Sequence, residues 1–104
     1  MRFNVKTGDT APLKAQLKYT DGSGPINLSG AVVTIYIGDS LVSGGACTID
    51  DAANGWVSYP WQPGENDNPG SWSVEFKVLV AGKFKRVPSG PAGTIRISRR
   101  VGAL

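Results

Sequence analysis

"SWSVEFKVLV", residues 71–80, contains the clearest structural signal of the chain. Apolar side chains recur there at every second position, namely Trp72, Val74, Phe76, Val78 and Val80, and polar ones stand between most of them. Successive side chains of a β-strand point to opposite faces, so this period of two predicts a half-buried strand. We expect Trp72 and Phe76 to be largely buried because both lie on the apolar face.

Similar but shorter patterns occur on both sides of this segment. "PLKAQLKYT", residues 12–20, alternates in the same way and predicts a strand with Leu13, Ala15, Leu17 and Tyr19 on one face. "AVVTIYIG", residues 31–38, is almost continuously apolar and β-branched, which predicts a central strand covered on both faces. A closing strand, "TIRISRR" at residues 94–100, should point Ile95 and Ile97 inward.

Further strand candidates are separated by turn and loop signals. We expect short strands near "ACTID" (46–50), "WVSYPW" (56–61) and "KFKRVP" (83–88), with Pro60 favouring an edge strand or a bulge. Loops are expected at "DSLVSGG" (39–45) and at "QPGENDNPG" (62–70). With turn signals every 8 to 12 residues or so, the pattern predicts an all-β chain, a single immunoglobulin-like antiparallel β-sandwich of about seven or eight short strands.

Composition agrees with one folded domain over residues 1–104. The 14 glycines and 7 prolines are spaced along the chain as strand punctuation, and 40% hydrophobic residues supply a core. No apolar run approaches the roughly 18 residues of a membrane span. The start, "MRFNVKTGD", lacks the apolar core of a secretion signal, so we expect synthesis in the cytoplasm and no membrane partner. The lone Cys47 is interpreted as a small buried apolar residue.

The inventory of reactive side chains argues against an enzyme. The chain has no histidine and one cysteine, which excludes Ser-His and Cys-His pairs and an ordinary zinc site. Six of the eight carboxylates stand in or beside Gly, Pro or Asn turns, where they accept local hydrogen bonds. "DGSG" and "ENDN" lack the spacing of a calcium loop. We therefore expect no catalytic residue, no cofactor and no metal.

Charge and aromatic residues leave binding functions open. The net charge of +3 raises the question of nucleic acid, but the basic residues mostly occupy polar positions of alternating strands, which favours a solvated face. Trp56, Tyr59 and Trp61 could instead form an aromatic platform for a glycan. Trp56 and Tyr59 differ in parity, so at least one should be exposed and should contribute to an interface or ligand patch.

The order of several motifs carries a family resemblance. These are "VKTGDTAPLKAQLKYTDGSGPINLSGAVVTIYI", "GWVSYPW", "PGSWSVEFKV" and "VPSGPAGTIRI". Over about residues 3–98 the chain resembles the immunoglobulin-like N-terminal domain of the bacteriophage baseplate upper protein family and its small stand-alone phage relatives. The resemblance implies a non-enzymatic virion structural protein, such as a minor tail, baseplate or capsid-decorating subunit, that contacts other virion proteins. The alternative function is a carbohydrate-binding or host-surface adhesion module.

The chain ends suggest where such contacts form. "MRFNV" and "TIRISRRVGAL" are both β-capable, and an open strand edge beside an apolar, basic tail would suit a homo-oligomer. The candidate interface residues are Trp56, Tyr59, Trp61, Arg99, Arg100, Val101 and Leu104.

Overall fold

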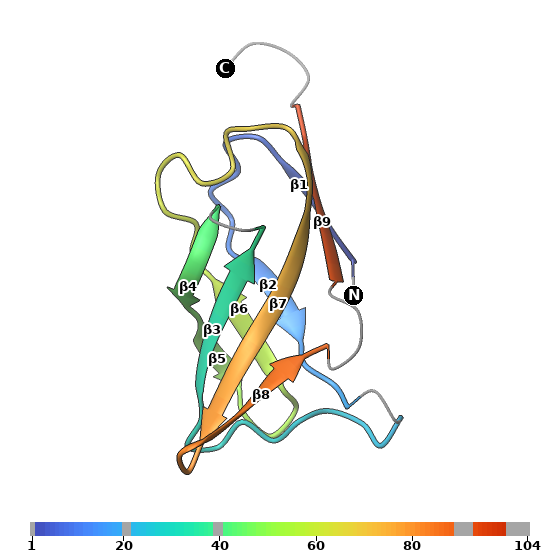
Figure 1. Ribbon diagram of the computed structural model, residues 1–104, viewed down its shortest axis with the longest axis vertical. Helices are drawn as coiled ribbons and strands as arrows, with labels where there is room; N and C mark the ends of the chain where they lie inside the picture. Colours follow the sequence, from blue (N-terminus) through green and yellow to red (C-terminus); the bar gives the residue numbers. More distant parts are fainter. Residues whose placement is uncertain (1, 20–21, 39–40, 89–92, 100–104) are drawn as a thin grey trace.

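The computed structural model describes residues 2–19, 22–38, 41–88 and 93–99, which form an all-β sandwich of two sheets (Figure 1). Its strands are β1 (Arg2–Lys6), β2 (Leu13–Gln16), β3 (Val32–Ile37), β4 (Val42–Ala46), β5 (Thr48–Asp51), β6 (Trp56–Tyr59), β7 (Gly70–Val80), β8 (Lys83–Val87) and β9 (Gly93–Ser98). The predicted all-β sandwich is confirmed, with nine strands instead of seven or eight. Within the described ranges no helix is long and apolar enough to cross a membrane.

The large sheet is organised around β7. Its strand order is β1-β9-β7-β3-β4, and β8 also pairs with β7. The first half of β7 pairs with β9, the second half with β8, and the opposite edge pairs with β3. β1 runs parallel to β9, which corrects the expectation of a purely antiparallel fold. The small sheet, β2-β6-β5, lies behind it (Figure 1).

Alternation along facing strands builds the core. In the large sheet, Val33, Ile35 and Ile37 of β3 lie opposite Val78, Phe76 and Val74 of β7, and all six are at most 4% exposed. Ala15 and Val57 face them from the small sheet. Leu17 and Leu28 lie outside the strands and are completely buried, so the connection between β2 and β3 also closes the core. Ile95 and Ile97 point inward as predicted.

Two predictions on the large sheet need correction. Phe76 is buried as expected, but Trp72, near the beginning of β7, packs against the core and is only half-buried. Val80, at the other end of the strand, is exposed next to the turn that leads to β8. β3 is central in its pairing but is buried on one face only, since Val32 on the opposite face is 59% exposed.

Other errors arise where strands begin and end. β2 ends at Gln16 and not at residue 20, and Tyr19 is exposed because the chain leaves the sheet before it. β4 occupies part of the predicted loop at 39–45. β6 is the middle strand of its sheet, so Pro60 marks neither an edge nor a bulge there but follows the last strand residue. The register shift opposite β6 lies on β5.

Gly55, directly before β6, lies close to the backbone of the residue that follows β2. Its φ is +73°, and its carbonyl accepts a 2.8 Å hydrogen bond from the Leu17 amide. A Cβ at this position would lie 2.5 Å from the Leu17 carbonyl oxygen. Only glycine fits, because the obstacle is backbone and cannot rotate away.

We predict that Gly55→Ala lowers the free energy of unfolding by about 2 kcal/mol more than Gly30→Ala does. Gly30 is a matched control, because its φ is +74° and a Cβ there meets nothing within 4 Å. Both variants carry the left-handed strain, and only Gly55→Ala adds the clash. Urea unfolding of the two variants measures the difference. Equal losses would contradict the tight approach of β2 to the turn before β6.

Candidate functional site

The three aromatic residues predicted as one patch are placed in three different environments. Trp56 is 41% exposed on the outer face of the small sheet, whereas Tyr59 is buried, with 3% exposed. One aromatic of the β6 strand is therefore exposed, as its parity predicted. Trp61 follows the strand and is half-buried, with its ring 5.6 Å from that of Tyr59 in an edge-to-face arrangement. The platform of three rings that was considered as a possibility does not form, because Tyr59 lies in the core.

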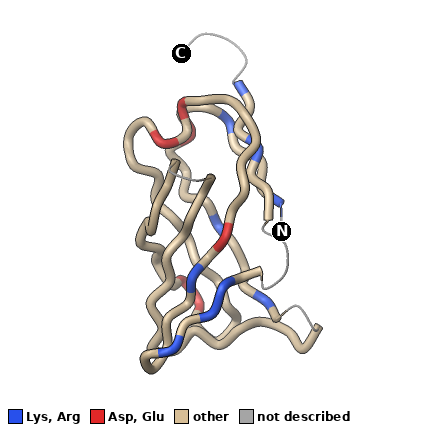
Figure 2. The backbone as a smooth tube through the Cα atoms, in the orientation of Figure 1, with Lys and Arg blue, Asp and Glu red and all other residues tan. Residues whose placement is uncertain are grey.

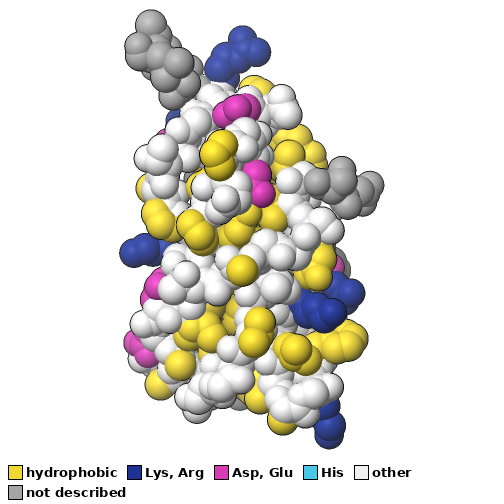
Figure 3. Space-filling view, turned by 90° about the vertical axis from the view of Figure 1, so that its left-hand side faces the viewer, with side chains coloured by type: hydrophobic (Ala, Val, Ile, Leu, Met, Phe, Trp, Pro, Cys, Tyr) yellow, Lys and Arg dark blue, Asp and Glu magenta, His cyan; other side chains and the backbone are white. Residues whose placement is uncertain are grey.

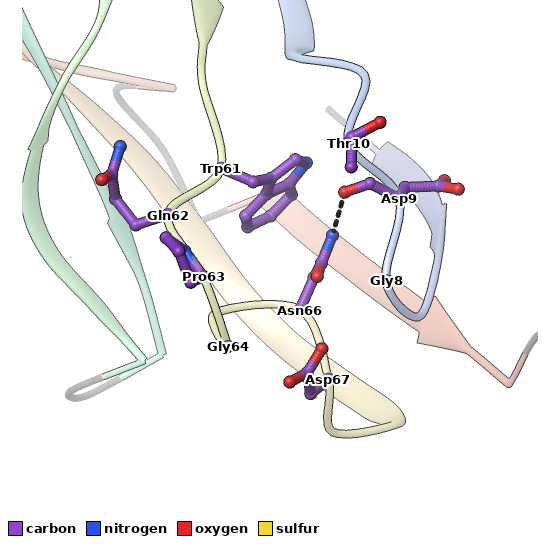
Figure 4. Close-up of a pocket in the computed structure, with 9 residues that line it drawn as sticks. All are labelled: Gly8, Asp9, Thr10, Trp61, Gln62, Pro63, Gly64, Asn66 and Asp67. Atoms are coloured by element: carbon purple, nitrogen blue, oxygen red, sulfur yellow. Dashed lines mark hydrogen bonds between the residues drawn. The ribbon is translucent and has the colours of Figure 1, made fainter. Parts of the chain in front are cut away.

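Trp61 instead lines a pocket at one end of the sandwich. The pocket, of about 330 Å³, lies between two loops that are far apart in sequence (Figure 4). It is lined by Gly8, Asp9, Thr10, Trp61, Gln62, Pro63, Gly64, Asn66 and Asp67. A second hollow, of about 310 Å³, shares Trp61 and Asp9 and extends along β1 and the start of β2. Trp61 thus separates two hollows beside the edge strands.

Hydrogen bonds fix the loop that carries this pocket. The Tyr59 hydroxyl donates to Glu65 Oε1 at 2.6 Å, and the backbone N–H of Gln62 donates to the same oxygen at 2.7 Å. Buried Asn66 donates from Nδ2 to the Asp9 carbonyl at 2.9 Å, which joins the two loops (Figure 4). Burial, followed by the hydrogen bond to Glu65 and the charge of that carboxylate, raises the pKa of the Tyr59 phenol above its usual value.

A second candidate surface lies on the outer face of the large sheet. Val32, Leu79 and Phe84 stand side by side on β3, β7 and β8, and they are 59%, 39% and 60% exposed. We call these three residues the apolar row. Lys77 and Arg86 pair with each other one step along the same face, and Lys77 Nζ lies 4.3 Å from the centre of the Phe84 ring.

The two outer sheet faces differ in charge. The strand positions that face outward on the large sheet hold one acidic residue, Glu75, and five basic ones: Arg2, Lys6, Lys77, Arg86 and Arg96. Figure 2 shows the basic residues along β7, β8 and the β1–β9 pair, and Figure 3 shows basic and hydrophobic side chains together at the lower right margin. The small sheet carries Asp50 and Asp51 beside Trp56, together with Lys14.

The predicted terminal interface is described only in part. Arg99 is exposed directly after β9, while Arg100, Val101 and Leu104 lie outside the described residues. The N-terminal segment forms β1, whose pairing occupies one edge of β9. β1 is therefore itself the edge strand of the large sheet.

Reactive groups are sparse in this structure. Among the residues it describes, no group of three His, Cys, Asp or Glu side chains could hold a metal ion. Cys47 packs against the core but is half-buried, less than the predicted burial, and desolvation raises the pKa of its thiol to about 12. The thiol is thus protonated and a weak nucleophile at neutral pH.

Sequence reasoning missed the apolar row. Each member is an apolar residue at a strand position that faces outward, where polar residues are usual. Phe84 lies between two lysines in "KFK", and Leu79 takes the place of the next polar residue after Lys77. These exceptions are visible in the sequence. Their adjacency is not, because it depends on the register of three strands.

Comparison with known proteins supports the fold. No family model matches the chain, and no curated protein gives a significant match. One similar solved structure is the N-terminal domain of ORF48 of phage TP901-1, which is 15% identical and aligns over 94% of this chain and 85% of that one, with a TM-score of 0.65. Another, CopC from Methylosinus trichosporium OB3b, is 12% identical over 99% and 89% of the two chains, with a TM-score of 0.53.

At these low identities the structural alignments show a shared fold and nothing further. The phage origin and the baseplate family that the motifs in the sequence imply remain predictions.

We predict that Tyr59→Phe lowers the free energy of unfolding by about 1–3 kcal/mol at pH 7, because Glu65 loses a short hydrogen-bond donor. Tyr36→Phe, on the outer face of the large sheet, is the control and should change little. Since the folded state holds the Tyr59 proton more tightly, the stability of the intact chain should also fall as pH rises above about 10. The stability of Tyr59→Phe should fall less steeply over this range. If chemical unfolding from pH 8 to 11 gives both proteins the same dependence of stability on pH, the raised pKa of Tyr59 is contradicted.

Proposed function

We propose that this chain is a non-enzymatic structural component of a phage virion that acts through protein–protein contacts. The observation that carries the proposal is the apolar row of Val32, Leu79 and Phe84, which lies open on the outer face of the large sheet. Adjacent exposed apolar side chains on a sheet face are typical of a surface that a partner covers. A polar rim beside an apolar centre is also a usual arrangement at an interface.

The phage setting draws on two likenesses. The fold matches a phage protein domain over nearly the whole chain, and the ordered motifs resemble a phage family. We infer that the protein is made in the host cytoplasm and resides in the virion as a minor tail, baseplate or capsid-decorating subunit. Its partners are then other virion proteins, and its contribution is shape and surface chemistry without catalysis.

We predict that the chain is found in purified particles by quantitative mass spectrometry, and that Leu79→Thr lowers its copy number about tenfold or more. Threonine keeps strand propensity while it removes the apolar surface. Val80→Thr is the matched control, because Val80 is 38% exposed on the same strand but has the opposite parity. Absence of the intact chain from particles would overturn the proposal. Equal incorporation of both variants would remove the apolar row from the contact.

Glycan binding is a second candidate function, favoured by the pocket at Trp61. A partly exposed indole beside amide and carboxylate groups offers a flat apolar surface with polar groups around it, as sugar rings require. The hydrogen-bonded loop holds these groups in place before any ligand arrives.

On a glycan array, we predict that any sugar bound by the chain is bound about tenfold more weakly by Trp61→Leu and equally well by Trp56→Leu. Trp56 is the control because it is exposed on a different surface. Thermal unfolding of both variants checks that each is folded. If no glycan binds the intact chain, or if Trp56→Leu is the variant that loses binding, the pocket is not a glycan site.

A further inference from the structure

We propose that the chain assembles with itself head to tail, the outer face of the large sheet in one copy packing on the outer face of the small sheet in the next. This deepens the proposed function by naming a partner, a second copy, and rests on that function only for the particle in which the assembly would occur. The two faces lie on opposite sides of one sandwich, so one molecule can use both at once (Figure 1).

The first support is that each face presents an exposed apolar group at a strand position where polar residues are usual. The large sheet presents the apolar row, centred on Leu79 with Phe84 at its side. The small sheet presents Trp56, which pairs with Gln16 on one side and Asp51 on the other. An exposed tryptophan among polar neighbours is a common anchor residue in protein interfaces.

The second support is the charge around each apolar group. Lys77 and Arg86 adjoin the apolar row, and Arg86 also lies 3.8 Å from Glu75 Oε1 on the same face. Asp50 and Asp51 adjoin Trp56, on a face whose strands carry Lys14 as their only described cation. Two cations beside the apolar row thus complement two carboxylates beside Trp56, which favours and orients encounter.

Hydrogen bonds hold the two carboxylates of the small face, Asp50 and Asp51, in fixed orientations. Asp50 Oδ1 accepts a hydrogen bond from Ser58 at 3.2 Å, and Asp51 Oδ2 accepts one from Asn54 at 2.9 Å. Each carboxylate has a second oxygen, and both residues are exposed. They are therefore oriented by the fold and remain able to accept bonds from cations.

Pairing of like faces is disfavoured by the same charges. Two large-sheet faces would bring Lys77 and Arg86 of both copies together with one glutamate from each. Two small-sheet faces would bring the acidic pairs together. Contact between unlike faces is heterologous, so it generates a ring if the rotation closes and an open stack if it does not.

A mixing experiment tests this arrangement with the purified full-length chain. Phe84→Thr removes exposed apolar surface from the large face, and Trp56→Thr does so on the small face. We expect the intact chain to show concentration-dependent oligomers in sedimentation velocity, and each variant alone to associate at least about tenfold more weakly. An equimolar mixture of the two variants should form dimers and nothing larger, since one intact large face and one intact small face remain. Val80→Thr, outside both faces, should assemble like the intact chain.

Several outcomes would overturn the proposal. These are an intact chain that stays monomeric up to about 1 mM, undiminished association of either variant, or a mixture that stays monomeric although both variants are folded by circular dichroism. Phe84→Tyr and Trp56→Tyr keep an aromatic ring and should retain association. Incorporation into particles is a separate measurement. A chain that is present in virions but monomeric in solution would refute the self-contact and leave the proposed structural role intact.

Discussion

The alternation of side chains along β7 is the constraint on which the rest of the structure depends. This strand contributes Val74, Phe76 and Val78 to the core and uses both backbone edges for pairing, with β3 on one side and β9 followed by β8 on the other. Because the pleat has a period of two, a shift of one residue would turn Phe76 to solvent and Lys77 into the core. The register of one strand therefore fixes three neighbours, and it also decides which residues appear on the outer face.

How far the sequence predicts this fold depends on the range of the interaction involved. Alternation is local, so inward side chains of β7 and β9 could be assigned from the sequence, as Phe76 and Ile95 show. The almost continuously apolar β3 gave no such alternation, and its exposed face was not predicted. The limits of the strands depend on neighbours, and Tyr19 was misplaced because the chain leaves β2 at Gln16. The apolar row could not be predicted from the sequence for the same reason, because its three residues become neighbours only through the register of the strands.

The candidate site shows the same division. Parity correctly predicted that Trp56 or Tyr59 would be exposed, and the burial of Tyr59 excludes the glycan platform of three rings that was considered as a possibility. The Trp61 pocket depends on the Asn66 side chain reaching the carbonyl of Asp9, a contact between distant parts of the chain. Loop composition indicated a turn-rich region there and gave no sign of what the turn would face. The predicted terminal contacts at Arg100, Val101 and Leu104 lie outside the described residues.

The parallel pairing of β1 with β9 also has a mechanical consequence. Arg2 pairs with Thr94 and Lys6 with Ser98, so the two strands near the chain ends run in the same direction. Tension between the two ends would pull β1 and β9 past each other along their length and would load all five residue pairs together. Hydrogen bonds loaded in shear must break in concert, whereas those of an unzipping hairpin break one at a time. The parallel pair should therefore resist separation when force is applied to the two strands along their length.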